Sequence, residues 1–225
     1  MRSRAGVTRA SVHHPLFARF YARCGPVMDA RAGFAEHRRT VLGGLTGRVI
    51  EIGAGPGLNF RHYPATVAEV VAIEPERRLR RLALDAAQRA EVPVDVVPGV
   101  AEALPVKSEA FDAAVASLVL CSVHDQERAL AELHRVLRPG GELRLLEHCR
   151  AEGRGCAALQ WAADRTVWPL LFGGCRTGRD TLAAVAATGF ELLEVRRFRV
   201  PEGAGGIALP VPSAPHVLAC ARRRG

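Results

Sequence analysis

The sequence has one lysine, Lys107, among 31 basic residues, and aromatic residues make up only 5% of the chain. So few aromatic side chains give no obvious platform for stacking bases. The arginines are scattered apart from three short clusters, 77–81, 196–199 and 222–224. Despite the net charge of +8, the sequence therefore predicts no nucleic-acid partner. RNA binding through the arginine clusters is the alternative.

Long apolar runs are also missing. A membrane-spanning helix needs about 18 or more apolar residues, and the longest candidate, Phe111 to Val123, is shorter and is interrupted by Asp112, Ser117 and Ser122. No apolar stretch follows the N-terminal arginines, so a secretory signal is not expected. These absences predict a cytoplasmic protein without a membrane partner, and they say nothing about its oligomeric state.

The six cysteines stand singly, and no CxxC pair occurs. That spacing does not indicate a zinc site or a thioredoxin-like motif. We therefore expect free thiols in a reducing compartment and no bound metal.

Length and composition favour a single globular domain over residues 1–225. Apolar residues make up 48% and charged residues 24% of the 225 positions, which is enough to bury a core and to exclude a disordered or fibrous chain. Residues 1–30 carry helical spacing from Pro15 to about Cys24, and they are expected to form an N-terminal lid.

Short apolar strands alternate with amphipathic helices through the middle of the chain. Such alternation predicts an α/β fold with parallel strands covered on both faces. The expected strands are 48–52, 67–73, 94–97, 111–117 and 142–148, and the expected helices are 32–42, 76–90 and 126–137.

The rhythm changes after residue 150. Residues 156–172 are expected to be helical, and the segment 151–180 as a whole is expected to form a helical insertion that covers a substrate. Thr177 to Asp180 fits a capping box for a helix that ends at Gly189. The strands 190–198 and 216–221 then flank a loop over 201–215, which is rich in glycine and proline.

The strongest local signal is the glycine turn after the strand 48–52. Glycine allows positive φ and a close approach of the backbone to a ligand. The spacing is GxGxG (Gly53, Gly55, Gly57), and Leu58 stands where a dinucleotide-binding turn has its third glycine. Glu51 would repel a pyrophosphate but suits a cationic ligand, so the turn argues against NAD or FAD.

A second acid follows the next strand. Glu74 lies 21 residues after Gly53 and ends the strand 67–73. In nucleotide-binding sheets an acid at this place accepts hydrogen bonds from ribose hydroxyls. The segment Gly99 to Pro105 follows the third strand, where an adenine ring would lie.

These pieces, together with Leu137 to Gly141, resemble the class I S-adenosylmethionine-dependent methyltransferases in the family's own order. The resemblance implies a Rossmann-like, seven-stranded, mostly parallel sheet with helices on both faces. It implies S-adenosylmethionine as cofactor and S-adenosylhomocysteine as product. The cofactor residues it implies are Glu51, Gly53, Ala54, Gly55, Gly57, Asn59, Glu74, Pro75, Val100, Ala101, Glu102, Ser117 and Leu118. Many relatives have Asp where this chain has Val100, so the adenine amino group needs another acceptor, such as Glu102.

The segments Ser117 to Val123, Leu146 to His148 and Leu171 to Cys175 look like the alkyl-thiol methyltransferases known from animals and related bacterial enzymes. The animal proteins carry an apolar N-terminal anchor that this sequence does not show. The resemblance implies S-methylation of a small-molecule thiol. O- or C-methylation of a phenolic or quinone-like metabolite is the alternative, and a non-catalytic cofactor-binding protein is an alternative of another class.

His148, at the end of the strand 142–148, is the candidate catalytic residue, as a base or an orienting partner. A histidine that is merely satisfied at a strand end explains it equally well. The candidate substrate-binding residues are Phe20, Tyr21, Cys121, Ser122, Trp161 and Trp168. Packing alone remains an alternative for Cys121 and for both tryptophans.

Overall fold

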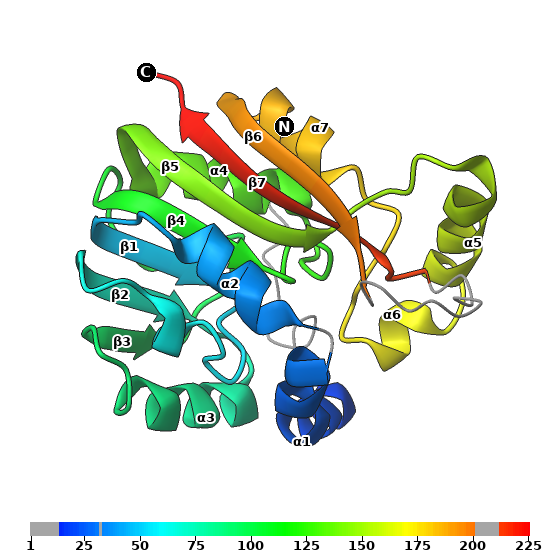
Figure 1. Ribbon diagram of the computed structural model, residues 1–225, viewed down its shortest axis with the longest axis horizontal. Helices are drawn as coiled ribbons and strands as arrows, with labels where there is room; N and C mark the ends of the chain where they lie inside the picture. Colours follow the sequence, from blue (N-terminus) through cyan, green and yellow to red (C-terminus); the bar gives the residue numbers. More distant parts are fainter. Residues whose placement is uncertain (1–13, 32, 201–211) are drawn as a thin grey trace, which may run out of the picture.

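A seven-stranded sheet forms the centre of the protein (Figure 1). The structure is a computed structural model that describes residues 14–31, 33–200 and 212–225. The strands are β1 (Gly47–Ile52), β2 (Val67–Ile73), β3 (Val94–Val97), β4 (Phe111–Ser117), β5 (Leu137–His148), β6 (Phe190–Arg199) and β7 (Pro215–Arg223). The α-helices are α1 (Pro15–Arg31), α2 (Phe34–Leu42), α3 (Arg77–Ala87), α4 (Gln126–Val136), α5 (Arg154–Asp164), α6 (Trp168–Leu171) and α7 (Thr181–Ala187).

The strands lie in the order β3-β2-β1-β4-β5-β7-β6. β1 to β5 pair in parallel, whereas β7 runs antiparallel to both β5 and β6. This confirms the expected mostly parallel sheet. The strand order reverses between β1 and β4, and in open sheets of this kind ligands bind beyond the carboxyl ends of the strands at that reversal.

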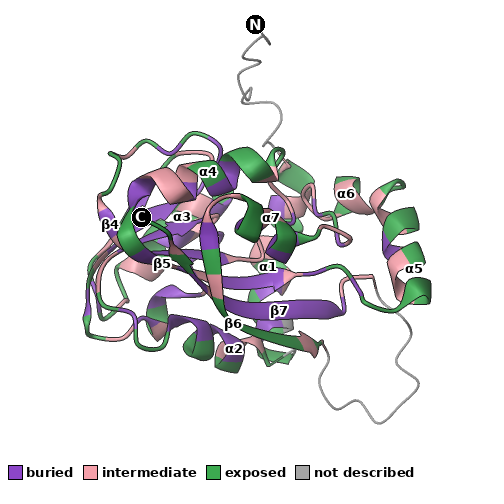
Figure 2. Ribbon diagram, turned by 90° about the horizontal axis from the view of Figure 1, so that it is seen from above, coloured by how far each residue is buried: buried purple, intermediate pink, exposed green. Residues whose placement is uncertain are grey.

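The sheet is buried because successive apolar residues of each strand enter different layers of the core. Ile50 and Ile52 pack in a cluster with Leu130 and Leu133 of α4, whereas Val49 packs in a second cluster with Val41 of α2. A strand covered on both faces needs such unbroken apolar runs. Helices α2 and α4 accordingly lie on opposite faces of the sheet (Figure 1), and the strands between them are mostly buried except for the exposed edge strand β6 (Figure 2).

Several boundaries differ from the sequence expectations. Helix α1 continues to Arg31, past Pro26. Strand β5 begins at Leu137, which pairs with Phe111 of β4, and the register then shifts so that Glu142 pairs with Ala113. The expected capping box is wrong: Asp180, not Thr177, caps α7 by accepting a hydrogen bond from the backbone N–H of Ala183 at 3.2 Å.

Residues 1–13 of the expected lid and most of the expected loop 201–215 lie outside the described residues. Within the described parts of the chain, none of the helices has both the length and the apolar character needed to cross a bilayer.

Candidate active site

A cavity of about 530 Å³ lies where β1, β4 and β5 end. Its size is typical of a small-molecule site. One half is lined by the turn after β1 and the loop after β2, and the other half by the ends of β4 and β5 together with α1 and α6.

The turn after β1 is built on glycines at positive φ, with Gly53 at 61° and Gly55 at 57°. A Cβ on Gly53 would lie 2.2 Å from a methyl carbon of Val119 in the loop after β4, so only glycine lets the two loops pack. A Cβ on Gly57 would collide with Ala86 of α3 and with Phe60. Gly57 therefore serves helix packing and does not line the cavity.

Glu51 is a buried carboxylate on the cavity wall. Its Oε2 accepts a hydrogen bond from the hydroxyl of Tyr63 at 2.7 Å, and its Oε1 accepts one from Nδ2 of Asn59 at 3.0 Å. Burial raises the pKa of Glu51 to about 7. Asn59 also donates to the hydroxyl of Ser117 at 3.1 Å, so it lies behind Glu51 and links β1 to β4 without lining the cavity itself.

Glu74 is the second buried carboxylate on the wall. It accepts hydrogen bonds from the backbone N–H groups of Gly55 at 2.7 Å and Glu76 at 2.8 Å. Burial raises its pKa to about 7 as well. Each of its oxygens keeps a lone pair for a further donor. The structure thus places Glu74 against the glycine turn, as the spacing predicts.

Glu102 lines the cavity, yet its carboxylate also holds the segment after β4 by accepting from the backbone N–H of His124 at 2.9 Å.

Leu118 adopts a left-handed φ of 57°, which is unusual for a bulky residue. The strain is held in place because Glu147, fully buried in β5, accepts from the N–H groups of Val119 and Leu120, both at 2.8 Å.

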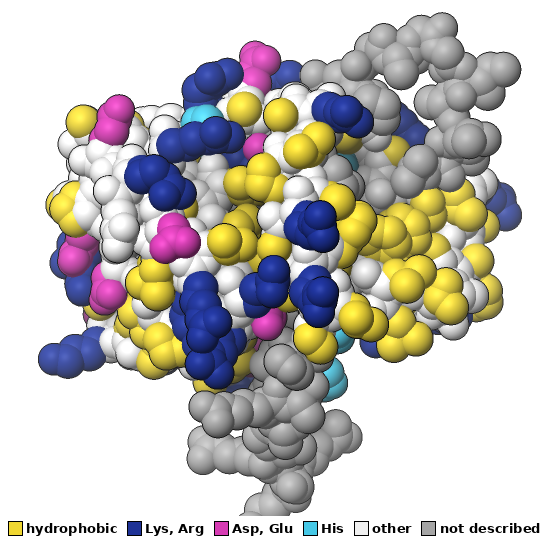
Figure 3. Space-filling view, turned by 90° about the horizontal axis from the view of Figure 1, so that it is seen from below, with side chains coloured by type: hydrophobic (Ala, Val, Ile, Leu, Met, Phe, Trp, Pro, Cys, Tyr) yellow, Lys and Arg dark blue, Asp and Glu magenta, His cyan; other side chains and the backbone are white. Residues whose placement is uncertain are grey.

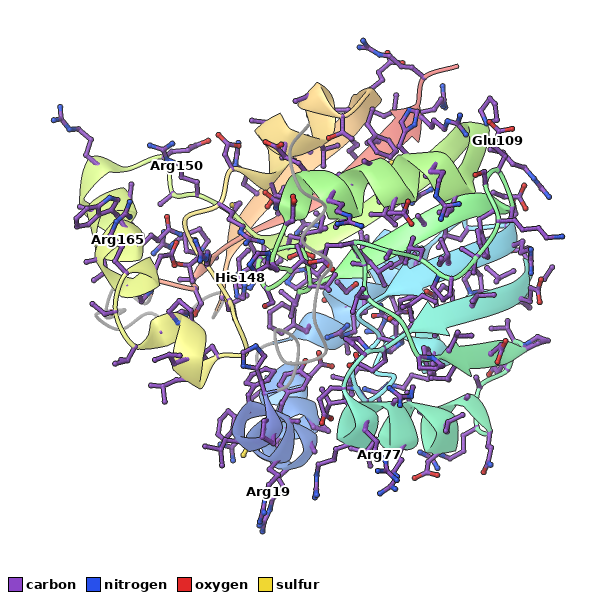
Figure 4. The ribbon with its side chains drawn as sticks, turned by 180° about the vertical axis from the view of Figure 1, so that it is seen from behind. Arg19, Arg77, Glu109, His148, Arg150 and Arg165 are labelled. Carbon is purple, nitrogen blue, oxygen red and sulfur yellow. The ribbon has the colours of Figure 1, made fainter. Side chains whose placement is uncertain are left out.

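Cys121, His148 and Cys175 meet at the wall of the cavity where β4 and β5 end. Nδ1 of His148 lies 3.4 Å from Sγ of Cys121 and 3.7 Å from Sγ of Cys175. A hydrogen bond with Cys175, together with burial, raises the pKa of the Cys121 thiol well above its usual value. His148 lies inside the molecule between the sheet and the α5–α6 segment, whereas Arg19 and Arg165 point outward (Figure 4).

Apolar rings close this side of the cavity. Phe17 and Tyr21 of α1 stack with ring centroids 5.4 Å apart, and Trp168 and Phe172 stack at 4.2 Å. All four line the cavity. Trp161 does not line the cavity. The residue is 59% exposed, and the guanidinium of Arg165 lies over its ring. The expectation of a substrate wall is therefore wrong for Trp161.

Seen from below, exposed apolar side chains gather over α5 and α6, and arginines lie nearer α1 (Figure 3).

Most of the predicted site residues do line this one cavity. They are Phe20, Tyr21, Glu51, Gly53, Ala54, Gly55, Glu74, Pro75, Val100, Ala101, Glu102, Ser117, Leu118, Cys121, Ser122, His148 and Trp168. Gly57, Asn59 and Trp161 do not line it.

The sequence reasoning missed several residues that the fold brings to the site. Arg38 of α2 is buried between Asp29 of α1, at 2.8 Å, and Oδ1 of Asn59, at 2.7 Å. Arg179 reaches in from the segment before α7 and donates to the carbonyl of Leu120 at 2.6 Å. A buried arginine needs a partner, but no local pattern around Arg38 or Arg179 marks either one.

Three residues that line the cavity carry a buried side-chain atom without a hydrogen-bond partner among the described residues. These atoms are Oδ2 of Asp29, Nε1 of Trp168 and Nε2 of His216. His216 uses its Nδ1 on the carbonyl of Ala214 at 2.9 Å, and its ring lies 4.6 Å from that of His148. Nε1 of Trp168 can only donate a hydrogen bond, whereas Nε2 of His216 can accept one while Nδ1–H donates to the carbonyl of Ala214.

A comparison with known families identifies residues 50–145 as a methyltransferase domain. The human thiol S-methyltransferase TMT1A is 32% identical over 159 residues, which are 68% of this chain and 64% of that protein. The human thiol S-methyltransferase TMT1B is 30% identical over 184 residues, which are 79% of this chain and 72% of that protein.

The ubiquinone/menaquinone biosynthesis C-methyltransferase UbiE of Syntrophotalea carbinolica is 31% identical over 150 residues, which are 65% of this chain and 62% of that protein. Among solved structures, a methyltransferase of Thermotoga maritima described as S-adenosylmethionine-dependent and as a possible histamine N-methyltransferase superposes with a TM-score of 0.68. It is 24% identical, and the match covers 93% of this chain and 99% of that one. The relatives are enzymes, which overturns the alternative of a non-catalytic binding protein.

Proposed function

This chain belongs to the class I S-adenosylmethionine-dependent methyltransferases, and from that premise we propose that it methylates the sulfur of a small apolar thiol. The observation that carries the proposal is the place where Cys121, His148 and Cys175 meet, at the end of an apolar cavity. The names of the two human relatives support the same substrate class.

The residues of the cofactor half fit this methyl donor. Two buried carboxylates, Glu51 and Glu74, have their pKa raised to about 7, chiefly because burial removes them from water. A ligand with an ammonium group, a sulfonium and a ribose diol supplies the positive charge and the donors that these carboxylates lack. Glu51 and Ser117 would hold the amino-acid end, and Glu74 the ribose.

The donor supplies a methyl group already activated by its bond to a positively charged sulfur. The protein has to align the nucleophile with that methyl group and exclude water, which can contribute roughly 7–11 kcal/mol to lowering the barrier. The stacked rings of α1 and α6 close the cavity, and His148 lies where it can accept or orient the proton of the thiol. A thiol needs little help, since its ordinary pKa is about 8.5.

Methylation of a phenolic or quinone-like ring remains the second candidate. The similarity to UbiE favours it, and the aromatic pair Trp168–Phe172 offers a flat ring a stacking partner at the cavity wall. A ring carbon or a phenol needs a base to remove its proton, and His148 is the candidate for that role.

A substrate panel separates the two. The purified protein is incubated with S-adenosylmethionine and, in parallel, simple alkyl thiols, aryl thiols, phenols and quinols, and S-adenosylhomocysteine and the methylated products are measured by mass spectrometry. We expect turnover of apolar thiols. If phenols or quinols are methylated and no thiol is, the proposal of S-methylation is wrong, and methylation of a phenolic or quinone-like ring is the function that remains.

The protein's partner is then a small molecule. All six cysteines are free thiols in the structure, which suits work in a reducing compartment such as the cytoplasm.

A further inference from the structure

Cys121, His148 and Cys175 come from three separate parts of the chain. Cys121 lies in the loop after β4, His148 ends β5, and Cys175 follows α6. The two sulfur atoms and the ring nitrogen all lie within 4.8 Å of one another, and all three residues line the cavity. The two cysteines are buried, and His148 is half-buried.

These separations match the edges of a zinc coordination tetrahedron. With Zn–S of about 2.3 Å and Zn–N of about 2.0–2.1 Å at tetrahedral angles, a sulfur and a nitrogen ligand are about 3.5–3.6 Å apart. The distances from Nδ1 of His148 to the two sulfurs, 3.4 and 3.7 Å, lie on either side of that value. Both sulfur-to-nitrogen separations are therefore within a few tenths of an ångström of those in a zinc site, and the two sulfurs lie within 4.8 Å of each other.

The backbone holds the two cysteines together. The N–H of Arg176 donates to the carbonyl of Cys121 at 2.9 Å, so the segment after α6 is bound directly to the loop after β4. That loop is fixed in turn by the carboxylate of Glu147 beneath it and by Arg179 on the carbonyl of Leu120. The ring of His148 packs on His216. A ligand set fixed in this way needs little ordering when a metal binds.

We propose that Cys121, Cys175 and His148 bind one zinc ion, whose fourth position faces the cavity. Two thiolates balance the charge of the ion, and three protein ligands with one open position are typical of catalytic zinc. The sequence expectation of no metal rested on the absence of a CxxC pair, and it does not apply to ligands contributed by three distant segments.

The open position would take the sulfur of the substrate, and this part of the inference rests on the proposed function. With His148 bound to zinc through Nδ1, its ring is no longer the proton acceptor considered above, and a coordinated thiol loses its proton to solvent. Its sulfur then forms a bond to the methyl carbon while the bond between that carbon and the sulfonium breaks, with the electron pair left on the donor's sulfur. One thiol and one sulfonium thus give two thioethers and one proton.

Cobalt substitution tests the site on the full chain. The protein is reduced, stripped with a chelator and titrated with Co²⁺ alone, because thiolate ligation gives a sulfur-to-cobalt charge-transfer band and tetrahedral geometry gives intense visible bands. We expect both, saturating at one cobalt per chain, and displacement by one equivalent of Zn²⁺. This measurement needs no variant and no activity.

Cys121→Ser and Cys175→Ser identify the ligands. Each is expected to weaken metal binding by more than about 100-fold, beyond the roughly 10–100-fold that loss of a hydrogen-bond partner of a ligand costs. Cys149→Ser is the matched control, since Cys149 is also buried and follows His148 directly, yet lies beside Arg197 outside the cavity. It is expected to bind metal as the unmodified chain does.

A chain that gives no charge-transfer band, or serine variants that are folded by circular dichroism and bind cobalt undiminished, overturns the site. If the cobalt bands form but do not shift when an alkyl thiol is added, the thiol ligand is wrong and the metal site stands. If the chelator-stripped protein methylates thiols at the full rate, the proposed function holds and the role of zinc falls.

Discussion

Glu74 is the residue on which the cofactor half depends most. Its two oxygens are fixed by the N–H groups of Gly55 and Glu76, so the carboxylate is aimed before any ligand arrives. We expect Glu74→Ala to weaken S-adenosylhomocysteine binding by about 1–3 kcal/mol, because buried ribose hydroxyls lose their acceptor. Calorimetry measures this directly.

Glu69→Ala is the control for Glu74→Ala, because Glu69 belongs to the same strand but is partly exposed and paired with Arg48. Equal affinity in both variants would remove Glu74 from the binding site.

The raised pKa values of Glu51 and Glu74 predict how binding depends on pH. In the folded protein burial raises the pKa of both carboxyls to about 7, against an ordinary 4.5. Glu51 is surrounded by Tyr63, Asn59 and, farther off, Arg38. Since a cationic donor favours the ionised form, its affinity is expected to rise as the pH increases from about 6 to about 8, with release of protons.

Titration calorimetry of the donor in buffers of different ionisation enthalpy counts those protons, and proton uptake would contradict the assignment. When no donor is added, the stability of the folded protein changes with pH in the opposite direction. The folded state binds more protons than the unfolded state between about pH 4.5 and 7, so this contribution to the free energy of unfolding is lost as the pH rises through that window.

At the scale of elements, the site is formed where two turns pack against each other. The turn after β1 can approach the loop after β4 only because Gly53 has no side chain to meet Val119. Gly53→Ala adds a steric collision to the roughly 1–2 kcal/mol cost of a left-handed alanine. We expect it to lower the free energy of unfolding and to abolish measurable donor binding, as followed by urea denaturation and calorimetry.

Gly44→Ala isolates the backbone cost in that experiment. Gly44 has a similar φ of 74°, but a Cβ there meets nothing within 4 Å. Only the left-handed penalty is expected, with donor binding intact. Adding Val119→Ala to Gly53→Ala should recover part of the lost stability, and no recovery would count against the collision as the cause.

The elements that could be predicted are those whose signal is local. Strands β2, β3 and β4 fall on the expected residues because each is an apolar run bounded by polar or glycine-rich segments. The start of β5 could not be predicted, since Arg138 to Gly141 is typical of a helix stop. Leu137 nevertheless pairs with Phe111 of β4, and regular pairing resumes only at Glu142. A tertiary contact also explains why the cap of α7 was not predicted. The hydroxyl of Thr177 donates to Asp164 of α5 at 3.2 Å, and Asp180 caps α7 instead.

At the scale of the whole molecule, the two halves of the site differ in how far the sequence predicts them. The cofactor half is made of strand ends and the turns that follow them, so spacing alone indicates Glu51, Gly53 and Glu74. The substrate half is assembled by tertiary packing. Cys175 and Arg179 reach it only because the segment after α6 folds back over β4 and β5, and no short-range pattern encodes that return.

Ligand binding should also stabilise the whole fold. At about 100 times its dissociation constant, S-adenosylhomocysteine is expected to add about 2.7 kcal/mol to the free energy of unfolding. For a chain of this size that corresponds to an increase of roughly 5–10 °C in the melting midpoint, which scanning fluorimetry or calorimetry detects. A midpoint that responds instead to a nicotinamide or flavin nucleotide would refute the class of cofactor.

Arg38 joins the entrance of the cavity to its floor, since one guanidinium holds Asp29 of α1 and the amide that supports Glu51. A ligand that moves the carboxylate of Glu51 therefore also acts on α1 through Arg38. By thermodynamic reciprocity, a ligand that moves α1 acts on Glu51 to the same degree. The two co-substrates are thus expected to change each other's affinity by the same factor, and Arg38 is the side chain that links their two sites.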